Sequence, residues 1–150
     1  MQIYYVAIDE KIRDEIGEKL GKTVKDHIHL DGGSFAAFDG KEIVGFISAY
    51  EKELGQTFWQ KDAYIDIIEV KSTHKRRGIG RELVARCEKW AKDSGLTQIR
   101  AWSSDDKFEA IQMWHKLGFG MCPAVMRGES TVKEFVGKPV YGFYVVKVLV

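Results

Sequence analysis

The order of apolar and polar residues indicates a strand and then a helix at the start of the chain. Residues 2–8 alternate and are rich in aromatic and β-branched types, which predicts a first strand. Apolar side chains then recur at every fourth position, at Ile12, Ile16, Leu20 and Val24. This spacing predicts an amphipathic helix that Asp9 caps, with a break near Gly21.

A hairpin is predicted next. Two β-prone runs, residues 34–38 and 42–50, flank the pair Asp39-Gly40. An Asp-Gly pair between two such runs is the strongest short-range signal for a β-hairpin. The polar residues 51–61, which contain Phe58 and Trp59, are predicted to form a loop.

The second half of the chain alternates between strand and helix patterns. A nearly continuous apolar run, residues 63–70, is typical of a central strand that is covered on both faces. Further strands are predicted over residues 97–102, 119–126 and 140–150, with a charged connection over 127–139. Apolar stripes at helical spacing indicate one helix that ends at Gly95 and another that ends at Gly118. This alternation predicts a mixed α/β sheet.

Composition limits the classes of function. A chain of 150 residues favours one domain over residues 1–150. Its 23 basic and 22 acidic residues nearly cancel, so the chain lacks the strong positive net charge that would favour binding to nucleic acid. Two distant cysteines, Cys87 and Cys122, have no zinc-site spacing, and the four histidines have none either, so we expect no metal. The short apolar N-terminal run predicts neither a signal peptide nor a membrane span, so a cytoplasmic protein is expected.

The apolar strand over residues 63–70 leads into a basic turn with two glycines, residues 74–80, and then into a helix. Exposed N–H groups and the dipole at a helix N-terminus favour a phosphate there. A nucleoside-triphosphate loop needs Lys-Ser or Lys-Thr after its last glycine, where this chain has Arg81-Glu82. A dinucleotide fingerprint needs a third glycine where Leu83 stands. The remaining pattern is basic-x-x-Gly-x-Gly, from Lys75 to Gly80.

With this pattern the chain resembles the GNAT superfamily of acyl-CoA-dependent N-acyltransferases. That family carries Gln/Arg-x-x-Gly-x-Gly/Ala between its fourth strand and third helix. Here Glu69-Val70 precedes Lys75 at the family's spacing, and residues 110–119 (Ala-Ile-Gln-Met-Trp-His-Lys-Leu-Gly-Phe) resemble the family's Ala-Ile-x-x-Tyr-x-Lys-x-Gly-Phe stretch. These elements cover about residues 63–119.

The resemblance implies a GNAT-like mixed central sheet of six to seven strands, mostly antiparallel, with a parallel and splayed fourth and fifth strand and about four flanking helices. It implies acetyl-CoA as cosubstrate, with backbone groups of Ile68 and Val70 near the pantetheine arm and the Val70 N–H on the thioester carbonyl. The expected cofactor-binding residues are Ile68, Val70, Lys75, Arg76, Arg77, Gly78, Ile79, Gly80, Arg81, Lys107 and Trp114.

Direct acetyl transfer to an amine requires a general base. The central strand offers two catalytic candidates, Asp66 and Glu69, and some proteins that resemble this chain carry an acid at the position of Asp66. Strand alternation places Asp66 on the same face of the strand as Tyr64, Ile68 and Val70, and it places Glu69 on the opposite face. A bulge in the strand would reverse this assignment of faces. We therefore rank Asp66 first; either acid could instead be an ordinary ion-pair partner.

The chain departs from the family at two positions. Trp114 stands where the family's tyrosine often protonates the thiolate, and an indole cannot act as an acid near neutral pH. Lys107 replaces a frequent asparagine. Thiolate protonation then falls to water or to a residue such as Tyr64 or Tyr141.

We therefore expect a cytoplasmic acetyltransferase that acts on a primary amine of a small molecule or peptide in a ternary complex. The alternative is a non-catalytic acyl-CoA-binding regulatory module. An excess of acids over residues 51–69 is consistent with a cationic acceptor, or with a solvated face. Neither nucleic acid nor a membrane is an expected partner, whereas a homodimer is compatible with the resemblance.

Overall fold

The computed structural model describes residues 2–53, 60–127 and 139–150. The chain divides into two compact units, Met1–Ile99 with Val148–Val150, and Arg100–Lys147. Whether they form one acetyltransferase domain stays a prediction. The aromatic residues Phe58 and Trp59 of the predicted loop, and most of the predicted connection over 127–139, lie outside the described residues.

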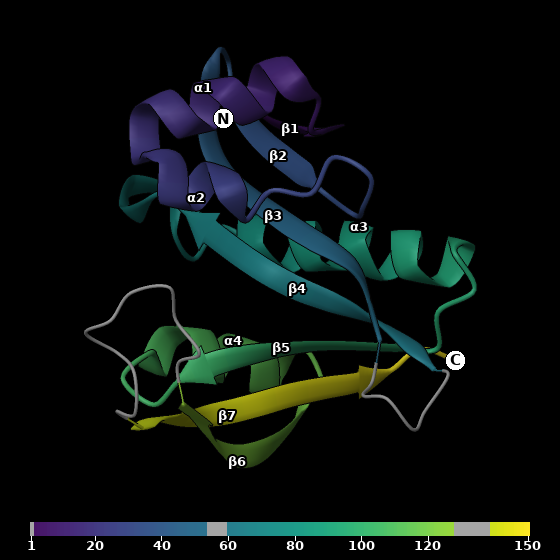
Figure 1. Cartoon of the computed structure of the whole chain (residues 1–150). Coiled ribbons are helices and arrows are strands. Elements are labelled where there is room, and N and C mark those ends of the chain that lie inside the picture. The colour runs from purple at the N-terminus through teal and green to yellow at the C-terminus, as the bar shows by residue number, and fades with distance from the viewer. Residues whose placement is uncertain (1, 54–59, 128–138) are drawn as a thin grey trace. The chain divides into compact units, whose positions relative to one another are not determined.

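Four antiparallel strands form the sheet of the first unit (Figure 1): β1 (Ile3–Ala7), β2 (Phe35–Asp39), β3 (Glu42–Glu53) and β4 (Lys61–Val70). The predicted hairpin is confirmed, and Gly40 in its turn has a φ of 61°. The predicted loop over residues 51–61 is wrong at both ends, because Glu51–Glu53 and Lys61–Ala63 pair with each other. Backbone pairing tolerates these polar side chains, and the Lys52 ammonium lies 4.3 Å from the centroid of the Tyr64 ring.

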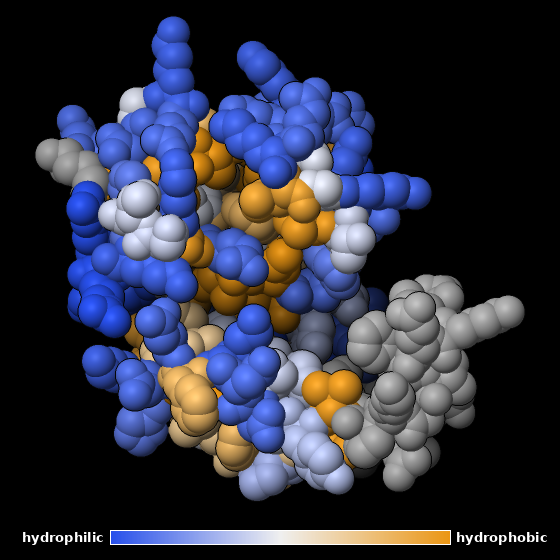
Figure 2. All heavy atoms as spheres, turned by 90° about the vertical axis from the view of Figure 1, so that its left-hand side faces the viewer, coloured by the Kyte–Doolittle hydropathy of each residue, from blue (hydrophilic) through white to orange (hydrophobic). Residues whose placement is uncertain are grey.

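Helices cover both faces of this sheet. The helix α1 (Glu10–Leu20) begins as predicted at Asp9, whose side chain accepts from the Ile12 N–H at 2.8 Å, and it ends at Gly21, where α2 (Lys22–Asp26) follows. These two helices lie on the face opposite α3 (Ile79–Asp93) (Figure 1). At the top of Figure 2, hydrophilic side chains project outward, and apolar side chains show between them.

The α1 side of the sheet carries a compact apolar core. Its buried members are Ile8, Ile16, Ile28, Ala36, Phe38 and Phe46, against which the partly buried Ile67 packs. On the other side, a Cβ at Gly45 would lie 3.1 Å from Ile79 of α3. The two faces of β3 and β4 can therefore be told apart residue by residue.

A β-bulge in β4 changes the predicted alternation. Ala49 pairs with Ile65 and the preceding Ser48 pairs with Ile67, so Asp66 is an extra residue on β4. Beyond the bulge Glu69 is the partner of Phe46, which belongs to the core on the α1 side. The prediction that Glu69 faces away from Asp66 is therefore wrong, as is the placement of Ile68 and Val70 with Asp66. Both carboxylates lie on the α1 face.

The second unit contains the rest of β5 (Gln98–Ser104), which begins in the first unit, and then α4 (Phe108–Lys116), β6 (Gly120–Arg127) and most of β7 (Pro139–Val148). The hydrogen-bonded strand order over the described residues is β1-β2-β3-β4-β5-β7-β6, with β4 and β5 parallel. The seven strands and four α-helices found within these described ranges confirm the predicted fold class.

Candidate functional site

The turn between β4 and α3 has the backbone conformation of an anion cradle. After the short 3-10 turn Ser72–His74, Arg76 and Gly78 adopt left-handed φ angles of 64° and 82°. Left-handed residues between right-handed ones make successive N–H groups converge. The α3 helix begins at Ile79, and its N-cap residue, Gly78, has no side chain that could cap the first turn. The N–H groups of this turn are thus left to water or a ligand.

Contacts with the β2–β3 hairpin hold this turn in place. The Lys71 N–H donates to the Val44 carbonyl at 2.8 Å, and the Lys71 ammonium contacts the Glu42 carboxylate. This hydrogen bond from Lys71 lowers the pKa of the Glu42 carboxyl. His74 Nε2 lies 2.9 Å from Asp39 Oδ2, and the His74 ring is mostly buried. His74 therefore supports the cradle through Asp39.

The shape and charge of the cradle fit a phosphate. A Cβ at Gly78 would meet no atom within 4 Å, so the space before the helix N-terminus is open. Lys75, Arg76, Arg77 and Arg81 are exposed around it. Convergent N–H groups and guanidinium groups are the usual ligands of phosphate oxygens. The residues present therefore fit the diphosphate of coenzyme A.

The backbone of β4 is oriented as the resemblance requires. Lys71 donates to Val44 on β3, and the next pair along the ladder is Val70 with Gly45. Antiparallel pairs alternate between hydrogen-bonded and non-hydrogen-bonded, so the N–H groups of Val70 and Ile68 point away from β3. The predicted donor at Val70 thus lies on the edge of β4 that β3 does not use.

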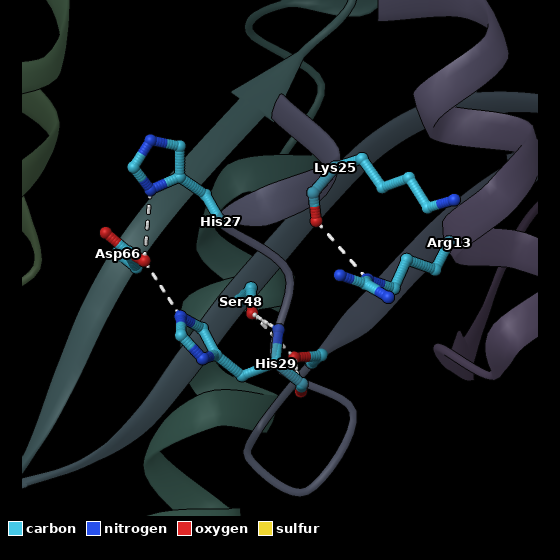
Figure 3. Close-up of polar contacts among 7 residues, drawn as sticks. Arg13, Lys25, His27, His29, Ser48 and Asp66 are labelled. Atoms are coloured by element: carbon cyan, nitrogen blue, oxygen red, sulfur yellow. Dashed lines mark hydrogen bonds and ion pairs between the residues drawn. The ribbon is translucent and has the colours of Figure 1, made fainter. Parts of the chain in front are cut away.

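Asp66 lies between two histidines, His27 and His29, to which the sequence analysis assigned no role. His29 Nε2 is 2.8 Å and His27 Nδ1 is 3.1 Å from the same atom, Asp66 Oδ2. Figure 3 shows both rings directed at the carboxylate. The side chain of Asp66 is 21% exposed, those of His29 and His27 28% and 47%. The only signal in the sequence is His-x-His around an apolar residue, Ile28, which is buried.

The loop that carries His29 is bound tightly to β3. The His29 N–H donates to Ser48 Oγ at 2.8 Å (Figure 3), and the His29 carbonyl accepts from Ser34 Oγ at 2.6 Å. Its ring stacks on Tyr50, with centroids 4.3 Å apart. Ser34 and Ser48 are buried and bond to each other at 2.7 Å. The position of His29 is therefore fixed by backbone, ring face and ring nitrogen together.

The remaining predicted residues occupy three kinds of position. Glu69 is exposed on the α1 face, and Lys107 is exposed at the start of α4. Trp114 is only 2% exposed in the second unit, where its Nε1 donates to Ser103 Oγ at 3.1 Å and its ring contacts Phe119. A role for Lys107 and Trp114 at the cofactor stays a prediction.

The two tyrosines considered as acids also differ in exposure. Tyr64 is buried in the first unit, with its ring at 71° to that of Tyr50, whereas Tyr141 is 58% exposed in the second.

Within residues 2–53, 60–127 and 139–150, no group of three or more His, Cys, Asp or Glu side chains has an arrangement that could hold a metal ion. None of the helices described there combines the length and apolar character that crossing a membrane requires.

Known proteins resemble this chain in sequence and fold. The rat protein N-acetyltransferase family 8 member 2 is 22% identical over 141 residues, which are 94% of this chain and 61% of that protein. The Escherichia coli streptothricin acetyltransferase is 33% identical over 89 residues, 59% of this chain and 48% of that protein. A chain in the crystal structure of the NatC complex bound to Gag peptide and CoA shares the fold with a TM-score of 0.74 at 17% identity, with 100% of both chains covered.

The family model fits most of the chain. It is the model of the acetyltransferase (GNAT) family, and it matches residues 3–119, from β1 through α4 to Phe119. The chain spans 61% and 48% of the lengths of the two curated relatives. The chain therefore belongs to the acetyltransferase (GNAT) family.

Proposed function

We propose that this chain is an acetyl-CoA-dependent N-acetyltransferase that acetylates a primary amine by direct attack in a ternary complex. The observation that carries the proposal is the cradle before α3, where Arg76 and Gly78 are left-handed and the N-cap residue Gly78 makes no side-chain hydrogen bond to the first helical turn. The β4 strand leads into this cradle and carries both candidate carboxylates on one face.

Different residues of the first unit bind the diphosphate, the thioester carbonyl and the amine. The N–H groups before and within the first turn of α3 hold the diphosphate, and Arg76, Arg77 and Arg81 supply positive charge around it. The Val70 N–H donates to the thioester carbonyl. The general base that accepts a proton from the amine is Asp66 or a side chain in contact with it. When bound, acetyl-CoA supplies the acetyl group as an activated thioester.

The acceptor belongs to one of two chemical classes, small-molecule amines or peptide amines. The streptothricin acetyltransferase is named for a small antibiotic, and the NatC structure holds a peptide together with CoA. Asp66 and Glu69 on one face of β4 favour an acceptor that carries positive charge elsewhere in the molecule.

A direct assay tests the proposal. The protein is mixed with acetyl-CoA and a panel of spermidine, an aminoglycoside and peptides with a free N-terminus or an internal lysine. Acetylated product is measured by mass spectrometry, with reactions lacking protein as controls. Product from at least one amine supports the proposal. Tight binding of acetyl-CoA without any product contradicts it and favours the non-catalytic binding module.

A further inference from the structure

We propose that His29 is the proton acceptor for the amine, and that Asp66 is a positioning residue that orients the His29 imidazole. This inference rests on the proposed function. The experiments distinguish a failure of the proposed function from a failure of the assignment of His29. It moves the base from the carboxylate that the sequence favoured to a ring 37 residues earlier in the chain.

The shared oxygen fixes where the protons of both rings lie. An ionised carboxylate only accepts hydrogen bonds, so each ring nitrogen that faces Asp66 Oδ2 must carry a hydrogen. In neutral rings this leaves the lone pairs on His29 Nδ1 and His27 Nε2. The Asp66 carboxylate is engaged twice through one atom, at 2.8 Å and 3.1 Å. The role that follows for this carboxylate is to orient the two imidazole rings.

The two rings differ in how firmly they are held. His29 is bound through its N–H by Ser48, through its carbonyl by Ser34, and through its ring by Tyr50 and Asp66. His27 follows the last residue of α2, is about half exposed, and contacts Asp66 through its ring. A base must keep one geometry to be effective. His29 meets this requirement better than His27 does.

Charged and titratable groups surround the His29 ring. Asp66 of β4 contacts it directly and also contacts His27, while Tyr50 of β3 stacks on its face. Tyr64 of β4 lies at the edge of Tyr50, and Lys52 of β3 lies over Tyr64. Glu69 is farther along β4 on the same face. The Lys52 ammonium contacts the face of the Tyr64 ring, whereas Asp66 contacts the His29 ring directly. The carboxylate of Asp66 is therefore the charged group that holds the His29 ring in place.

The proposed step conserves atoms and charge. The amine nitrogen forms a bond to the acetyl carbon, and the carbon–sulfur bond of the thioester breaks. The sulfur leaves with its electron pair as a thiolate, which water protonates. The proton lost by the amine nitrogen passes to His29 Nδ1 and then to solvent.

Kinetics of three matched histidine variants test the assignment. His29→Gln should lower kcat/KM by about 10²- to 10⁴-fold, the usual contribution of a general base. His27→Gln should lower it by less than about tenfold, and His115→Gln, at an exposed position in the last turn of α4, should leave it unchanged. Equal losses in His29→Gln and His27→Gln, or no loss in His29→Gln, overturn the proposal.

The pH profile separates an imidazole base from a carboxylate base. Imidazoles as a class titrate between about pH 5 and 8, and carboxyl groups near pH 4. The acidic limb of kcat/KM should therefore lie in the imidazole range and disappear in His29→Gln. An acidic limb near pH 4 that persists in His29→Gln shows that a carboxylate is the base, and it overturns the proposal.

An NMR measurement without any substrate keeps the positioning role of Asp66 testable. Nitrogen-15 spectra of the imidazoles above pH 8 should show hydrogen on Nε2 of His29 and on Nδ1 of His27. His27 should change to the commoner Nε2–H tautomer in Asp66→Ala. If His29 carries its hydrogen on Nδ1, the proposal is wrong even where the protein acetylates amines. If the tautomers are as expected but no amine is acetylated, the proposed function fails and the positioning geometry stands.

Discussion

Gly78→Ala offers a sharp test of the cradle, because the structure separates its effect on stability from its effect on ligand binding. The φ of Gly78 is 82°, where a residue with a Cβ is strained by about 1–2 kcal/mol. The new Cβ would meet no protein atom within 4 Å, so no clash adds to this cost. Alanine also lowers the entropy of the unfolded chain, which offsets about 0.4–1 kcal/mol.

The net loss in the free energy of unfolding is thus about 1 kcal/mol, or a fall in Tm of about 2–4 °C for a chain of this size. The added methyl group projects into the open space where the phosphate is expected. Loss of one charge-assisted hydrogen bond costs about 1.5–3 kcal/mol. We therefore expect the Kd for coenzyme A to rise about 10- to 100-fold in isothermal titration calorimetry.

Gly95→Ala is the matched control, because Gly95 lies just beyond the other end of α3. Its φ is 77°, and a Cβ there would also meet no atom within 4 Å. Both variants should lose the same stability, and only Gly78→Ala should lose affinity for coenzyme A. Unchanged affinity in Gly78→Ala, or equal losses of affinity in the two variants, refutes the cradle.

Two further predictions concern the core and the thiols of the protein. Ile16→Ala removes a side chain that is 1% exposed and should lower the urea-derived free energy of unfolding by about 2–5 kcal/mol, whereas Leu20→Ala, at 54% exposure, should change it by less than about 0.5 kcal/mol. Comparable losses would contradict the placement of α1. Burial raises the pKa of the Cys87 thiol, so the native protein should show one fast thiol, Cys122, towards a disulfide reagent and two after unfolding. Two fast thiols in the native state would contradict the burial of Cys87.

Local signals explain most of what could be predicted before the structure was known. The Asp9 cap, the end of α1 at Gly21 and the hairpin at Gly40 each depend on a few neighbouring residues. The cradle was predictable for the same reason, because its glycine spacing and the flanking strand and helix are contiguous in sequence. The sequence pattern did not predict that the polar ends of β3 and β4 form strands, because strand formation depends on the partner strand as well as on residue type.

The sequence by itself determined the order of the elements, the phosphate-binding turn and the acidic character of the central strand, since each follows from local spacing and residue type. Only the tertiary structure decided the face on which Glu69 lies, because the bulge at Asp66 comes from the register with β3. It also decided that His27 and His29 meet Asp66, a contact across 37 residues for His29. Such contacts depend on how the loop after α2 is held, where His29 bonds to Ser48 of β3 and to Ser34, and no local sequence pattern predicts these long-range contacts.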